Sequence, residues 1–147
     1  MNGAKRILIV YYSNTGNTLR TAETIQKKAG GTLCGIYPWQ PYPIDLHELE
    51  RQVRREQQEG YCPRLLPFQV KLEDYDEIFL GTPNWYGGIA PPLTAFLSKG
   101  DFSGKILIPF CTYAQSRIGQ MKELIQACCP GANVLEGFSV KMMMKEI

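Results

Sequence analysis

The sequence predicts an α/β fold in which a parallel sheet is covered by helices on both faces. Apolar runs suited to strands alternate along the chain with segments of helical period. The clearest run, 7–12, is apolar without alternation, which is typical of a central parallel strand with both faces buried. At 147 residues, 44% hydrophobic and 20% charged, the chain has the size and composition of one globular domain. We therefore expect a single domain over residues 1–147.

Five strands are expected. The runs 78–80 and 106–108 share the continuous apolar character of 7–12. Residues 33–37 and 134–140 form weaker candidates, because Gly35 breaks the first and Glu136 with Gly137 breaks the second. Such interruptions suit strands near the edges of a sheet.

Four helices are expected between these strands. The first contains Leu19, Ala22, Ile25 and Ala29 on one face, and the glycine pair at 30–31 gives it a left-handed stop. The other three are marked by apolar residues at helical spacing, namely Leu46, Leu49 and Val53; Leu93, Phe96 and Leu97 after Pro91 and Pro92; and Ile118, Met121, Leu124, Ile125 and Cys128.

Charge and composition exclude several classes of protein. Sixteen Lys and Arg against 14 Asp and Glu give a net charge of +2, too mild to indicate nucleic-acid binding. The longest aliphatic run, 7–10, is far shorter than the roughly 20 apolar residues of a membrane span. Five cysteines without a C-x-x-C pair and a single histidine predict reduced thiols and no metal site. We expect a cytoplasmic protein with neither a nucleic-acid nor a membrane partner.

The loops after the strands are the candidate sites, because ligands of parallel α/β sheets bind at the carboxyl ends of the strands. The first such loop consists of Ser13, Asn14, Thr15, Gly16, Asn17 and Thr18. Hydroxyls and backbone N–H groups at a helix N-terminus can bind a phosphate without lysine, and Gly16 lets the backbone approach it closely. The alternative is a helix-capping turn that binds no ligand.

These loops resemble those of a known family. Residues 12–18, Tyr-Ser-Asn-Thr-Gly-Asn-Thr after an Ile/Val strand, resemble the phosphate loop of the flavodoxin family, which holds the terminal phosphate of FMN. Residues 81–88, followed by Pro91 and Pro92, are similar to the family's second flavin loop, and residues 110–112 resemble the approach to the third. The resemblance implies a doubly wound, five-stranded parallel sheet with strand order 2-1-3-4-5, and non-covalently bound FMN as the cofactor.

The second loop is implied to hold the flavin ring. Trp85 and Tyr86 offer aromatic faces for stacking, and Gly87 lets backbone amides approach the ring edge. The alternative for Trp85 is an ordinary place in the core. The flavin contacts expected in this loop are Thr82, Pro83, Asn84, Trp85, Tyr86 and Gly87.

The third loop departs from the family pattern. Residues 112–117 read Thr-Tyr-Ala-Gln-Ser-Arg, where the family usually has a Gly/Ser-rich or acidic stretch. We still expect flavin contacts from Thr112, Tyr113 and Arg117, and the Arg117 cation would stabilise a reduced, negatively charged flavin.

The end of the chain is a second departure. Residues 141–147 are too few for the covering helix with which family members normally end, so we expect that helix to be short or absent. One face of the sheet would then be exposed or covered by a second subunit in a homodimer.

The function implied by the resemblance is electron transfer through bound FMN, with a redox partner protein or a small-molecule acceptor and no catalytic residue in the chain itself. Because electron-carrier flavodoxins are typically acidic and this chain is net positive, direct reduction of a small acceptor such as a quinone is one alternative. Cys111 and Arg117 have the spacing of cysteine-based phosphatases, which is a second alternative. A non-catalytic binding module of the same fold is a third.

Overall fold

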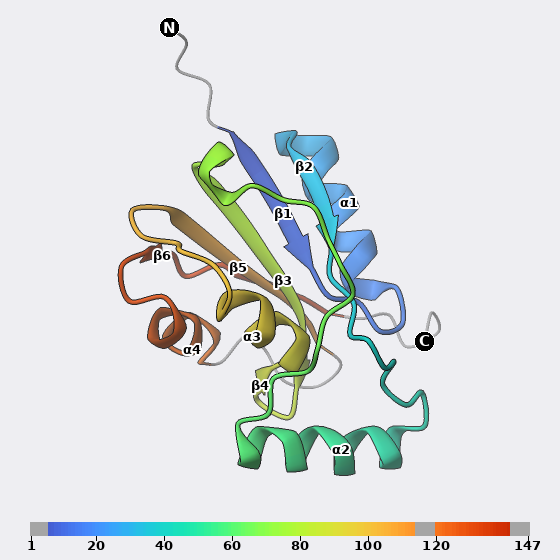
Figure 1. The fold of residues 1–147 in the computed structure, drawn as a ribbon. Coiled ribbons are helices and arrows are strands. Elements are labelled where there is room, and N and C mark those ends of the chain that lie inside the picture. Colours follow the sequence, from blue (N-terminus) through green and yellow to red (C-terminus); the bar gives the residue numbers. More distant parts are fainter. Residues whose placement is uncertain (1–5, 114–119, 142–147) are drawn as a thin grey trace, which may run out of the picture.

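The computed structural model describes residues 6–113 and 120–141, which form a parallel sheet with helices packed on both faces (Figure 1). The strand order is β2-β1-β3-β5-β6, and β7 pairs with β5 farther along the same edge. With β5 counted as the fourth strand and β6 and β7 as a divided fifth, this is the predicted order 2-1-3-4-5. The predicted doubly wound fold is confirmed.

The centre of the sheet is built from β1 (Ile7–Tyr11), β3 (Glu77–Trp85) and β5 (Ile106–Tyr113), with β2 (Thr32–Gly35) at one edge. Leu8 and Val10 of β1 pair with Ile78 and Leu80 of β3, and all four side chains are fully buried. The continuous apolar runs in the sequence therefore correspond to strands covered on both faces.

The fifth strand is divided into β6 (Asn133–Val134) and β7 (Phe138–Lys141), both parallel to β5. Pro109 of β5 faces this edge, because Leu107, two residues earlier, accepts a hydrogen bond from the N–H of Leu135. Proline has no N–H to offer a neighbouring strand, so the ladder is interrupted beside it. Gly137 fills the gap with φ +75°, and a Cβ there would lie 2.0 Å from the Pro109 carbonyl oxygen.

The helices divide between the two faces of the sheet. α1 (Asn17–Ala29) packs Ala22 and Ile25 against Ile9 and Phe110 on one face. α3 (Pro91–Leu97) and α4 (Met121–Cys128) cover the other face, where they contribute to the larger core cluster (Figure 1). Their apolar spacing was visible in the sequence, and the predicted helices are present. Ile118, the first residue expected in the last of them, lies outside the described residues.

α2 (Leu46–Glu59) has a different position, across the carboxyl ends of the strands and below β4 in Figure 1. It begins at Asp45, whose side chain accepts a hydrogen bond from the Glu48 N–H, and it ends at Gly60 with φ +66°. A one-turn 3-10 helix, η1 (Leu72–Asp74), precedes β3. The long segment between β2 and β3 thus delivers a helix to the edge of the sheet where the candidate loops lie.

A hairpin at the end of β3 was not predicted. β4 (Gly88–Ile89) pairs antiparallel with β3, so that Trp85 lies opposite Gly88. The two residues between them, Tyr86 and Gly87, have φ values of +55° and +83°. A two-residue hairpin of type I′ requires positive φ at both central positions, and tyrosine is an unusual residue for the first of them.

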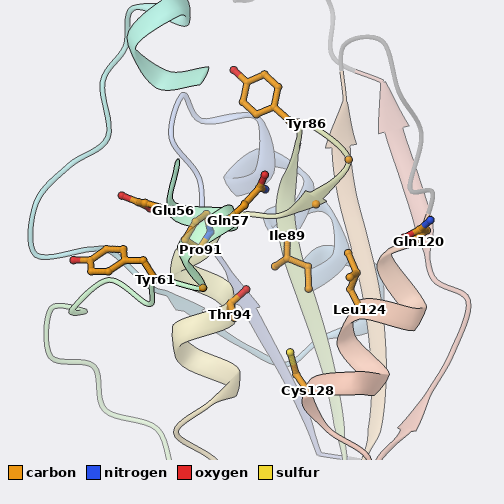
Figure 2. A pocket seen from close by; sticks show the side chains of 13 residues that line it. Glu56, Gln57, Tyr61, Tyr86, Ile89, Pro91, Thr94, Gln120, Leu124 and Cys128 are labelled. Atoms are coloured by element: carbon orange, nitrogen blue, oxygen red, sulfur yellow. The ribbon is translucent and has the colours of Figure 1, made fainter. Parts of the chain in front are cut away.

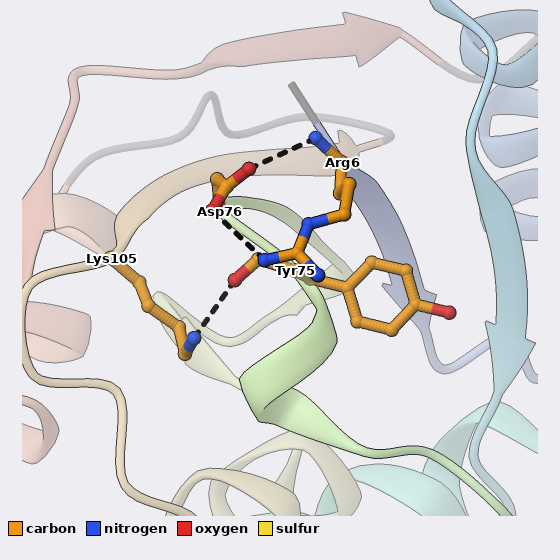
Figure 3. Close-up of polar contacts among 4 residues, drawn as sticks. All are labelled: Arg6, Tyr75, Asp76 and Lys105. Carbon is orange, nitrogen blue, oxygen red and sulfur yellow. Dashed lines mark hydrogen bonds and ion pairs between the residues drawn. The ribbon is translucent and has the colours of Figure 1, made fainter. Parts of the chain in front are cut away.

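Polar contacts tie the amino ends of the three central strands together (Figure 3). The Arg6 N–H donates to Asp76 Oδ2 over 3.1 Å, and the Arg6 guanidinium lies 3.5 Å from Oδ1. Lys105 Nζ donates to the Tyr75 carbonyl oxygen over 2.8 Å. These contacts join the residues just before β1, β3 and β5, at the end of the sheet opposite the candidate loops.

On the sheet face that packs against α1, two side chains of β7 are only partly covered by the described residues. Phe138 of β7 stacks on Phe110 with 5.7 Å between the ring centroids, yet Phe138 and Val140 are 39% and 37% exposed. Residues 142–147, where the terminal helix is expected to be short or absent, lie outside the described residues. Coverage of this face by a second subunit stays a prediction. Within residues 6–113 and 120–141, no helix has the length and apolar character to cross a membrane.

Candidate functional site

The loop between β1 and α1 is curled around the N-terminus of α1. The N–H of Gly16 donates to Ser13 Oγ over 3.0 Å, and Asn17 Nδ2 donates to Thr15 Oγ1 over 3.2 Å. Gly16 caps the helix with φ +99°, a value that favours glycine. The first N–H groups of a helix have no partner inside the helix, so the loop curls around a set of available donors with serine and threonine hydroxyls beside them.

A buried hydrogen bond links this loop to the end of β5. The hydroxyl oxygens of Thr18 and Thr112 are 2.9 Å apart, and each residue is 2% exposed. Tyr113 follows as the last residue of β5. The structure therefore brings the start of the predicted third loop to the first loop. Arg117 lies outside the described residues.

A cation beside the first loop was missed by the sequence analysis. Arg20, in the first turns of α1, donates to Asn17 Oδ1, and its Nη1 lies 3.2 Å from the position that a Cβ on Gly16 would occupy. Helical side chains lean toward the N-terminus of their helix, which places Arg20 next to Gly16, four residues earlier. That spacing was available in the sequence as a signal. The loop therefore offers an anion both hydrogen-bond donors and a nearby positive charge.

The second predicted loop is the β3–β4 hairpin. Thr82 is buried, and its Oγ1 accepts from the Ala90 N–H over 3.0 Å while donating to the Pro83 carbonyl over 2.8 Å. Asn84 Oδ1 accepts from the Gly87 N–H over 3.1 Å. These side chains define the shape of the loop.

The two aromatic residues of this loop lie in different surroundings. Trp85 is 7% exposed and packs edge-on against Tyr42 and Tyr12, with ring centroids 5.1 Å and 5.5 Å away. Tyr86 is 37% exposed, and the guanidinium of Arg54 lies 5.1 Å from its ring centroid. Of the two, Tyr86 has the ring face more accessible to a ligand. The role of each as a flavin contact stays a prediction.

A buried acidic residue of α2, Glu56, is hydrogen-bonded to the aromatic cluster of Tyr12, Tyr42 and Trp85. Glu56 is 6% exposed; the Tyr42 hydroxyl donates to its Oε1, and Gln52 Nε2 donates to its Oε2 over 2.9 Å. Burial, followed by the hydrogen bond and the charge of Glu56, raises the pKa of Tyr42, and burial raises that of Tyr12. Both phenols therefore stay protonated and act as donors. The sequence analysis missed Glu56, because its burial depends on Tyr42 folding over α2.

The surroundings of Cys111 do not support the phosphatase alternative. A nucleophilic cysteine needs an accessible thiol with a lowered pKa. Cys111 lies within β5 and is fully buried, and its Sγ faces Ser139 Oγ at 3.7 Å. Burial raises the pKa of its thiol. The loop that would have to surround a phosphate begins beyond it, and Arg117 is outside the described residues.

Comparison with known proteins places these loops in a family context. A family model described as Flavodoxin matches residues 6–147. A curated relative, an NAD(P)H dehydrogenase (quinone) of Paraburkholderia phymatum, is 28% identical over 127 residues, which are 78% of this chain and 60% of that protein. The chain thus spans about 60% of the length of this curated relative.

Several solved structures have the same fold. A candidate flavoprotein of Bacteroides uniformis is 29% identical with a TM-score of 0.86, covering 97% of this chain and 94% of its own. Another, from Bacteroides eggerthii, is 28% identical with a TM-score of 0.85, covering 92% and 88%. A flavoprotein of Lactobacillus acidophilus solved in complex with FMN is 23% identical with a TM-score of 0.80, covering 94% and 93%.

Proposed function

This chain belongs to the flavodoxin family, and from that membership we propose that it binds FMN non-covalently and transfers electrons through it. The observation that carries the proposal is the loop 13–18 curled around the N-terminus of α1 and hydrogen-bonded through Thr18 to Thr112 at the end of β5. FMN, when bound, supplies one- and two-electron redox chemistry, while the protein supplies binding and electrostatics.

The residues of the first loop fit a phosphate. The hydroxyls of Ser13 and Thr15 belong to the loop that precedes α1, and Thr18 lies in the first turn of α1 with its hydroxyl bonded to Thr112. Gly16 offers no side chain to block the approach. Arg20 adds a positive charge next to Gly16. This combination of donors, charge and open backbone is typical of anion sites at helix N-termini. Asn14 and Asn17 complete the proposed phosphate contacts.

The flavin ring is proposed to lie between the hairpin and the end of β5. Tyr86 would stack on it, and Gly87, with open space around its Cα, would let the backbone approach the ring edge. The other proposed contacts are Thr82, Pro83, Asn84, Trp85, Thr112, Tyr113 and Arg117. Trp85 is best placed to support Tyr86 from within the core, since its own ring packs against Tyr12 and Tyr42.

Reduction of a small-molecule acceptor is a second candidate function within the flavin hypothesis. The relative from Paraburkholderia phymatum is a quinone-dependent dehydrogenase by description. The net charge of +2 also contrasts with the acidic surface typical of carriers that dock on basic protein partners. Both observations favour a reductase that passes electrons directly to a small molecule.

A two-step assay tests the proposal and separates the two candidates. The FMN-loaded protein is reduced with dithionite without oxygen, and reoxidation by cytochrome c is followed optically. NADH or NADPH oxidation is then measured with a quinone present. A carrier gives fast reoxidation and no nicotinamide turnover, and a reductase gives quinone-dependent turnover. Bound FMN that dithionite cannot reduce would contradict both.

A further inference from the structure

A pocket of about 390 Å³ lies beside the β3–β4 hairpin (Figure 2), and its described lining includes no residue of the loop 13–18. Its walls come from the end of α2, the hairpin itself, the start of α3, and α4. The residues that define its character are Gln57, Tyr86, Ile89, Thr94, Gln120 and Leu124. The sequence analysis assigned flavin contacts to Tyr86 and Gly87 of the hairpin and no function to the other walls.

We propose that this pocket binds an uncharged aromatic compound with ring carbonyl or hydroxyl groups, and that this compound is the electron acceptor of bound FMN. The second part rests on the function proposed above. The first part concerns only the chemistry of the pocket and can be tested without FMN.

The lining of the pocket favours uncharged ligands. Its described wall contains no Lys, Arg or His, and the carboxyl group of Glu56 in that wall already accepts hydrogen bonds from Tyr42 and Gln52. An anion would find no cation to pair with among these lining residues, and the Arg54 guanidinium is engaged over the Tyr86 ring. The loop 13–18 has the opposite character, with Arg20 and helix N–H groups. The two sites therefore suit different ligands.

The shape and lining of the pocket suit a small flat molecule. Ile89, Leu124 and Pro91 supply apolar surface, while Gln57, Gln120 and Thr94 supply a few groups able to donate hydrogen bonds. Mostly apolar walls with a few polar groups are typical of small-molecule sites, whose volumes run from about 300 to 1,000 Å³. A volume near the lower limit admits a one- or two-ring compound, and its ring carbonyls would accept from the amides and the hydroxyl.

The pocket and the second flavin loop share a wall. Tyr86, Gly87 and Gly88 line the pocket and belong to the hairpin proposed to hold the flavin ring. α2 holds this wall through Gln57, whose Nε2 donates to the Trp85 carbonyl over 3.1 Å, and through Arg54 over the Tyr86 ring. A ligand in the pocket would therefore contact the element that faces the flavin.

The proposed reaction balances once FMN has been bound and reduced. The acceptor, a ring dicarbonyl compound, would take up two electrons and one proton from the anionic reduced flavin and one proton from water, and would become the dihydroxy compound. The chain's own contribution is to hold the acceptor next to the hairpin.

Duroquinone, or tetramethyl-1,4-benzoquinone, is the appropriate probe. The four ring carbons that are not carbonyl carbons all carry methyl groups, so Cys128 in the pocket wall has no open ring position for addition. Titration into the FMN-free protein, followed by amide NMR shifts, should perturb Ile89, Thr94 and Leu124 and leave residues 13–18 unmoved. Shifts confined to other residues, or no shifts at all, would overturn the assignment of the pocket.

Substitutions in the pocket wall test whether duroquinone binds there and whether that binding affects its reduction. Leu124→Trp, which fills the pocket, should weaken duroquinone binding at least tenfold, and Thr94→Val, the milder change, should weaken it several-fold. Leu135→Trp, on an exposed residue between β6 and β7, is the matched control and should change nothing. In the FMN-loaded protein, Leu124→Trp should raise KM for duroquinone tenfold without changing reoxidation by ferricyanide.

The outcomes separate the two parts of the proposal. Unchanged KM for duroquinone in both pocket variants, with FMN still bound, would overturn the acceptor role. Duroquinone binding in the pocket of a protein that fails to bind FMN would support the ligand class, while contradicting both the acceptor role and the proposed function.

Discussion

The side-chain hydroxyls of Thr18 and Thr112 lie 2.9 Å apart in the interior and join the first turn of α1 to the end of β5. This bond fixes the loop 13–18 relative to the sheet edge where the second and third loops also begin. It directly connects the two segments proposed to hold opposite ends of the cofactor.

Removal of either hydroxyl should destabilise the protein. Thr18→Val or Thr112→Val leaves the other buried hydroxyl unpaired, which costs about 1–3 kcal/mol of unfolding free energy. The double variant should lose less than the sum of the two, because no unpaired hydroxyl remains. Urea unfolding of the FMN-free protein measures each value. Thr24→Val, on the exposed side of the same helix, is the control and should change stability by no more than about 0.5 kcal/mol. Strictly additive losses at positions 18 and 112 would show that the bond contributes no coupling.

Two glycines, one at each end of α1, allow an effect on protein stability to be distinguished from an effect on FMN binding. Gly16 and Gly30 have φ values of +99° and +80°, so alanine is strained at both and should cost about 1–2 kcal/mol of stability. Only Gly16 borders the proposed phosphate site. Gly16→Ala should therefore weaken FMN binding at least tenfold, while Gly30→Ala should leave it within twofold, as measured by quenching of flavin fluorescence. Equal effects of the two on FMN affinity would contradict the position assigned to the phosphate.

The two aromatic residues of the hairpin should respond differently to substitution. Trp85→Leu opens space in the cluster with Tyr12 and Tyr42, and we expect it to lower the unfolding free energy by about 3 kcal/mol. Tyr86→Leu removes a ring that is 37% exposed, so it should weaken FMN binding several-fold with a stability change below about 1 kcal/mol. Urea unfolding and FMN titration of both variants test the assignment. If Trp85→Leu weakened FMN binding and Tyr86→Leu did not, Trp85 and not Tyr86 would be the flavin contact.

Asp76 should make stability depend on pH in the acid range. The N–H and guanidinium of Arg6 hold the pKa of this carboxyl below its usual value. Its stabilising contribution is therefore present above the unfolded-state pKa of about 3.9 and is lost as pH falls through the lower pKa of the folded state. Asp76→Asn should lower the urea midpoint at pH 7, and the difference from the wild type should shrink as the pH falls below about 4. Asp74→Asn, on an exposed neighbour in η1, should have a smaller effect at pH 7. A difference for Asp76→Asn that stays constant down to pH 2.5 would contradict the pairing with Arg6.

The sheet and its helices could be predicted because local signals agreed with the fold. The run 7–12 is apolar on both faces, the α1 residues repeat at helical spacing, and Glu136 with Gly137 marked the place where the last strand divides. The cause of that division, Pro109 facing the same edge, could be identified only once the register of β5 was known.

The arrangement around the hairpin could not be predicted, because it depends on contacts between distant segments. Tyr86 occupies a turn position that normally carries asparagine, aspartate or glycine, so no hairpin signal was visible at this position. The burial of Trp85 depends on Tyr12 and Tyr42, and that of Glu56 on Tyr42. The position of α2 across the sheet edge decides which of the two hairpin aromatics remains accessible.

The measurement that tests the central claim most directly compares FMN with riboflavin, which lacks the phosphate. Each is titrated into the purified protein, and quenching of flavin fluorescence gives the stoichiometry and Kd. If the loop 13–18 holds the phosphate, FMN binds at one per chain and at least a hundredfold more tightly than riboflavin. Equal affinities, or no binding of saturating FMN, would contradict the account.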